Sequence, residues 1–61
     1  MDIVSIVKTK EEDITLKDYD KNLKQDVYTI TYFDNKKNKY VFQCLGGSDR
    51  FIIFLKLYEQ K

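Results

Sequence analysis

The sequence contains no histidine, tryptophan, proline or alanine among its 61 residues, and Cys44 is its single cysteine. Histidine is the commonest general base in enzymes and a common protein ligand of zinc. Its absence excludes a Ser–His–Asp triad and a Cys–His nucleophile within one chain. A single cysteine excludes an intrachain disulfide, and an unpaired cysteine is typical of a reducing compartment. We therefore expect a protein that is not an enzyme, without cofactor or metal, in the cytoplasm.

The chain also lacks a long apolar run and a strong net charge. Its most apolar run, FIIFLKLY at residues 51–58, is far shorter than the ~20 residues of a membrane-spanning helix, so we expect no membrane span. The net charge of +1 argues neither for nor against nucleic acid. A hydrophobic content of 43% favours a folded chain. A chain of this size buries only about 60% of the surface that its unfolded form exposes, so its stability is marginal. Self-association or binding to a larger partner would add stability.

The amino-acid usage carries a hint about the gene. Lysine outnumbers arginine ten to one, and isoleucine, asparagine, tyrosine and phenylalanine are frequent. These residues have AT-rich codons, whereas alanine, proline and most arginine codons are GC-rich. The usage indicates an AT-rich genome, such as that of a low-GC bacterium or one of its phages.

Four segments have the alternating or β-branched pattern of strands. They are DIVSIVK (2–8), ITLKDY (14–19), VYTITYF (27–33) and YVFQCL (40–45). The last two flank a polar loop at 34–39, so residues 27–45 predict a β-hairpin. Charged or polar connectors separate the other segments, which predicts an antiparallel meander.

The segment after Gly46 and Gly47 has two interpretations. In a helix, Ser48 can serve as N-cap, Asp49 suits the positive N-terminus, and Lys61 suits the C-terminal end. The apolar residues then fill one side, with Ile52 and Ile53 at its margins. In a strand, both faces are apolar, which a small sheet hides only in a two-sided core or a dimer.

The helical interpretation predicts an α+β fold, with a four-stranded antiparallel meander covered by one C-terminal helix. The strand interpretation predicts an all-β five-stranded small barrel. Either way, residues 1–61 form a single domain.

Two groups of side chains are candidates for a binding surface. The chain has more aromatic residues than a core of this size obviously hides, and aromatic residues are enriched at protein interfaces. The candidate partner-binding residues are Phe51, Phe54, Leu57, Tyr58, Tyr28 and Tyr32. The alternative is a nucleic-acid surface of lysines, one arginine and surface tyrosines, at Lys36, Lys37, Lys39 and Arg50. A lysine-rich hairpin tip also serves simply to keep a sheet edge soluble.

Residues 26–58 resemble the small dimeric uracil-DNA glycosylase inhibitors of Bacillus phages. The shared order is a tyrosine-rich hairpin, a glycine-containing turn, Ser48 and Asp49, and an aromatic helix that ends in Leu57 and Tyr58. In those inhibitors, two subunits form an apolar pocket that traps the DNA-intercalating side chain of the glycosylase. The resemblance implies a homodimer that binds a host protein in the host cytoplasm, with Phe51 or Phe54 as the pocket aromatic.

The chain departs from that family in its charge. The phage inhibitors mimic DNA and carry glutamates beside the pocket, whereas Ile52 and Ile53 occupy this stretch here and the net charge is +1. This difference bears on which enzyme the chain would bind more than on its predicted fold and dimer. Three functional hypotheses follow: a phage-encoded inhibitor that binds a host enzyme, a small nucleic-acid-binding barrel, and a structural or assembly subunit.

Overall fold

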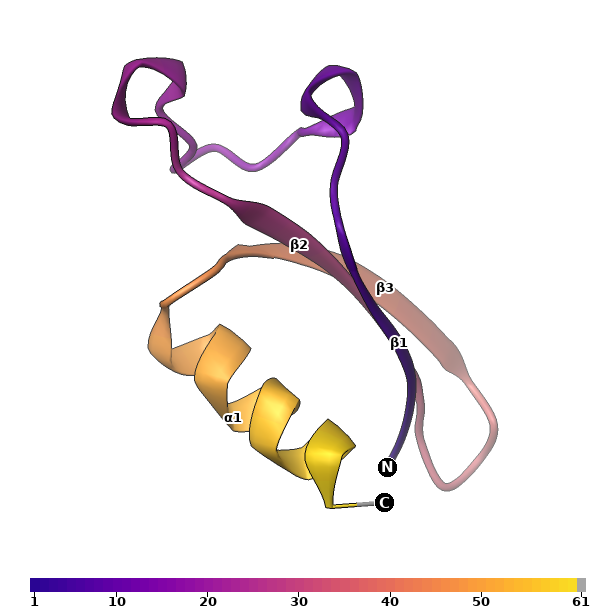
Figure 1. The fold of residues 1–61 in the computed structure, drawn as a ribbon. Helices are drawn as coiled ribbons and strands as arrows, with labels where there is room; N and C mark the ends of the chain where they lie inside the picture. Colours follow the sequence, from indigo (N-terminus) through magenta and orange to yellow (C-terminus); the bar gives the residue numbers. More distant parts are fainter. Residues whose placement is uncertain (61) are drawn as a thin grey trace.

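A computed structural model describes residues 1–60 of the chain. The elements are β1 (Asp2–Lys8), the 3-10 turns η1 (Glu11–Asp13) and η2 (Lys21–Leu23), β2 (Val27–Phe33), β3 (Lys39–Leu45) and α1 (Asp49–Glu59). The strands form one antiparallel sheet in the order β1-β2-β3. Helix α1 lies against one face of this open sheet (Figure 1). The predicted α+β class and the C-terminal helix are confirmed.

The predicted strand at residues 14–19 is wrong, and the sheet has three strands instead of four. Residues 9–26 form a connector with two 3-10 turns, which extends beyond the sheet at the end away from the N-terminus (Figure 1). Inside the predicted strand, the N–H of Tyr19 donates a hydrogen bond to the carbonyl of Leu16 at 3.2 Å, which closes a turn. Such local bonds compete with a sheet ladder, and two apolar residues are too few to overcome them.

The five-stranded barrel is also wrong, because residues 49–59 are helical. The Ser48 hydroxyl accepts a hydrogen bond from the N–H of Phe51 at 3.2 Å and donates one to the carbonyl of Leu45 at 2.7 Å. The first bond gives a partner to one of the unpaired N–H groups of the first helical turn, and the second joins the start of the helix to the end of β3. The predicted cap is confirmed, whereas Lys61 lies outside the described residues.

The predicted hairpin is confirmed, with β2 and β3 paired from Val27 opposite Leu45 to Phe33 opposite Lys39. Its turn is organised by Asp34, whose Oδ1 atom accepts hydrogen bonds from the backbone N–H groups of Lys36 and Asn38. The bond from the Asn38 backbone holds the pKa of Asp34 below its ordinary value. The turn is therefore fixed by an ionised carboxylate.

The core lies between the sheet and α1. Ile3, Ile30 and Cys44 form its buried cluster, and Ile30 is completely inaccessible to water. Because side chains alternate along a strand, Ile30 shares its face of β2 with Tyr28 and Tyr32. This small cluster and the aromatic rings around it hold the helix in place.

Candidate functional site

An aromatic layer joins α1 to the sheet. The ring of Phe51 stacks on Tyr28 with centroids 4.6 Å apart. The ring of Phe54 lies 5.4 Å from that of Tyr32 and 5.0 Å from that of Phe42. Four of the six predicted partner-binding residues therefore contact one another inside the chain: Phe51, Phe54, Tyr28 and Tyr32.

Four large apolar side chains of α1 remain exposed, namely Ile52, Ile53, Leu57 and Tyr58, and together they are called the outer helix surface. Their exposed fractions are 40%, 57%, 41% and 36%. No residue of α1 is fully buried, since the helix touches the sheet along only one side. The structure thus leaves the predicted Leu57 and Tyr58 accessible and adds Ile52 and Ile53.

The exposure of the two isoleucines could have been predicted from the sequence by assuming that Phe51 and Phe54 face the sheet. Ile52 and Ile53 lie on either side of the stripe of Asp49 and Lys56, which faces away from Phe51 at 100° per residue. A helical projection that counts all apolar residues together places them at the margin of the inner side. The useful signal is that Phe51 and Phe54 are the larger side chains, and their rings pack on the aromatic residues of the sheet.

The predicted nucleic-acid residues belong to different elements, namely the helix and the hairpin turn with the strand that follows it. Arg50 lies on the ring of Phe42, with its guanidinium carbon 4.1 Å from the ring centroid. The predicted lysines lie in or beside the hairpin turn: Lys36, Lys37 and Lys39. Among the tyrosines that could stack on a base, Tyr28 is covered by Phe51, and Tyr40 stacks at 4.9 Å on Tyr32.

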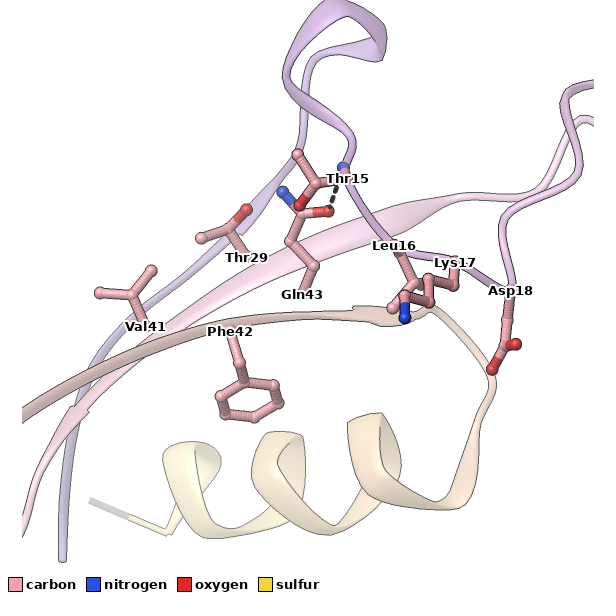
Figure 2. Close-up of a pocket in the computed structure, with 8 residues that line it drawn as sticks. All are labelled: Thr15, Leu16, Lys17, Asp18, Thr29, Val41, Phe42 and Gln43. Carbon is pink, nitrogen blue, oxygen red and sulfur yellow. Dashed lines mark hydrogen bonds between the residues drawn. The ribbon is translucent and has the colours of Figure 1, made fainter.

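An open pocket of about 570 Å³ lies where the connector meets the sheet (Figure 2). Its residues are Thr15, Leu16, Lys17, Asp18, Thr29, Val41, Phe42 and Gln43. The Gln43 amide accepts a hydrogen bond from the N–H of Thr15 and donates one to the carbonyl of Asp13, both at 2.9 Å. Gln43 thereby fixes the connector over β3, which is a structural task.

The pocket offers little for chemistry or for a metal. Its ionisable side chains are Lys17 and Asp18, both of which are exposed to water. Within residues 1–60, no group of three cysteine, aspartate or glutamate side chains could hold a metal ion. The outer helix surface is therefore the stronger candidate site.

Cys44 lies in the core cluster, with 5% of its surface exposed. Burial raises the pKa of its thiol, so the side chain stays a neutral, small hydrophobe at physiological pH.

We expect Cys44→Ser to lower the free energy of unfolding by about 1–3 kcal/mol, because the new hydroxyl is buried in the apolar core without a hydrogen-bond partner. Cys44→Ala is the matched control, since it removes the sulfur without adding a polar group. Guanidinium denaturation followed by circular dichroism measures both variants. A serine variant more stable than the alanine variant would show that the hydroxyl finds a hydrogen-bond partner.

Comparison with protein-family models, curated proteins and solved structures finds no match to this chain. No helix within residues 1–60 has the length and apolar character needed to span a membrane. The functional argument therefore depends on the geometry of the outer helix surface.

Proposed function

We propose that this protein is a non-catalytic protein-binding module whose contact surface is the outer helix surface. The observation that carries this proposal is the exposure of Ile52, Ile53 and Leu57 on a helix that aromatic rings anchor to the sheet. Apolar side chains that cluster at one surface are typical of protein interfaces. The anchored helix presents them without a large loss of conformational entropy on binding.

The finer proposal is that the module is phage-encoded and inhibits a host enzyme, with uracil-DNA glycosylase as the candidate target. Its support is the resemblance of residues 26–58 to the phage inhibitors. In the structure, the matched Ser48 caps the helix, Asp49 begins it, and Leu57 and Tyr58 lie in its exposed last turn. A glycosylase assay with uracil-containing DNA tests this target directly, and undiminished activity at a molar excess of the module would remove it.

The main experiment compares immobilised wild-type chain with two variants in lysate of a low-GC bacterium. Ile53→Glu places a charge at the most exposed position of the outer helix surface. Leu23→Glu is the matched control, since Leu23 is 64% exposed and lies in η2, away from the helix. We expect the wild type and Leu23→Glu to retain one host protein in stoichiometric amount, and Ile53→Glu to bind it at least about tenfold more weakly.

The same experiment separates the other two hypotheses. Retention of nucleic acid that is lost as the salt concentration rises would favour the lysine surface. Equal retention of proteins by all three chains would contradict a role for the outer helix surface. A structural or assembly subunit would instead bind a protein encoded by its own genome, and not one from the host lysate.

A further inference from the structure

The middle of the connector is attached to the sheet at one place. At the two ends of the connector, the N–H of Thr9 donates to the carbonyl of Val27, and the N–H of Gly46 donates to that of Asp26, both at 2.8 Å. Between these ends no residue is buried, and the local hydrogen bonds join connector residues to one another. In the part of the chain that the structure describes, Gln43 is therefore the side chain of the sheet that binds the middle of the connector.

Residues 13–18, called the strap below, are the part of the connector that Gln43 holds. Its amide accepts a hydrogen bond from the N–H of Thr15 and donates one to the carbonyl of Asp13. Because Cys44 faces the core, the neighbouring Gln43 points to the opposite face of the sheet. The strap is therefore attached from the face of the sheet that α1 does not cover (Figure 2).

The rest of the strap passes the edge of β3 toward the start of the helix. Leu16 and Asp18 border an open cavity of about 190 Å³ together with Cys44 and Arg50. The strap also borders the open pocket of about 570 Å³ described above. Open space on both sides leaves the strap with few apolar contacts, so the two bonds to Gln43 are its main attachment.

We propose that the strap is a movable cover for the end of the β3 edge, that Gln43 holds it closed, and that it opens while the rest of the fold stays intact. A free strand edge is a template for pairing with other chains, and native proteins often cover such edges with a loop. Opening the strap breaks the two bonds to Gln43, whereas unfolding breaks the whole sheet. Opening therefore requires less free energy than unfolding.

The thiol of Cys44 reports the position of the strap. Only 5% of the Cys44 surface is exposed, and Leu16 and Asp18 border it from the edge of the sheet. Opening of the strap removes these two neighbours and gives a thiol reagent access to the sulfur. The rate of reaction with the thiol reagent DTNB then measures the fraction of molecules in which the strap is open.

The reaction of DTNB with the full wild-type chain, measured at increasing urea concentrations, tests the proposal without a variant. Opening of the strap exposes little surface, so we expect the reaction rate to depend on urea much less than global unfolding does. Circular dichroism measures the global transition in the same solutions. A reaction rate that follows urea as steeply as global unfolding would overturn the proposal, because Cys44 would then react only in the unfolded chain.

Two variants test the role of Gln43. Gln43→Thr removes both bonds and keeps a residue that favours a strand, so we expect it to raise the DTNB rate, and the exchange rate of the Thr15 amide, at least about tenfold. Gln25→Thr is the matched control, since the Gln25 amide binds the N–H of Asp20 inside the connector, and it should change the DTNB rate less than about twofold. Wild-type rates in Gln43→Thr, or equal increases in the two variants, would overturn the proposal.

Discussion

The Ile30→Ala variant should lose about 3 kcal/mol of its free energy of unfolding, which is at least about a third of the stability of a chain of this size. Ile30 is completely buried at the centre of the sheet, beneath α1. Truncation of a buried isoleucine removes both its transfer free energy and the contacts around the cavity it leaves. A domain of 61 residues has only about 3–9 kcal/mol in total. We therefore expect the unfolding midpoint of the variant to fall to a clearly lower urea concentration.

Urea denaturation followed by tyrosine fluorescence measures this loss. Val7→Ala is the control, since Val7 is 54% exposed on β1 and its truncation should change the free energy by less than about 0.5 kcal/mol. Similar losses in the two variants would mean that the buried cluster does not stabilise the fold.

The Phe54→Ala variant should detach α1 from the sheet, with a loss of about 2–3 kcal/mol. The Phe54 ring lies between Tyr32 and Phe42, and it contributes to the largest group of aromatic contacts in the chain. Because the Phe54 side chain is partly exposed, the expected loss is below that of a fully buried phenylalanine. The amide protons of α1 should then exchange more rapidly, while those of the β2–β3 hairpin are less affected.

Ile53→Ala is the matched control for this experiment, since it truncates the adjacent residue on the outer helix surface. We expect it to change the free energy of unfolding by less than about 0.5 kcal/mol and to weaken partner binding. The comparison distinguishes a residue that positions the helix from one that contacts a partner. Equal losses of stability at the two positions would show that α1 packs on the sheet through a different side.

Local signals in the sequence were sufficient for the hairpin, and they supported the helix while leaving a strand open. Alternation along residues 27–33 and the Asx-rich loop define the hairpin, and its strands and turn need no distant contact to be recognised. The helix follows from Ser48 and from the charged stripe of Asp49 and Lys56. These features depend on neighbours within a few residues, where propensity and periodicity are informative.

The sequence was misleading where the outcome depends on distant contacts. The alternation of Ile14 and Leu16 is that of a strand, yet the N–H of Thr15 bonds to Gln43, 28 residues away, and the connector does not join the sheet. Likewise, the candidate partner-binding residues of the helix and the hairpin are all apolar or aromatic, so residue type alone does not separate buried side chains from exposed ones. Only the packing of Phe51 and Phe54 on the sheet shows which apolar residues are left for a partner.

The most direct test of the outer helix surface is the broadening of methyl resonances by a soluble gadolinium chelate, measured on the isolated wild-type chain. The account predicts that the methyl groups of Ile52 and Ile53 broaden as strongly as those of Leu23, while Ile30 is protected. That result would establish an apolar helix surface that is open to a partner. Protection of Ile53 to the same degree as Ile30 would contradict the account, because that side of α1 would then belong to the core.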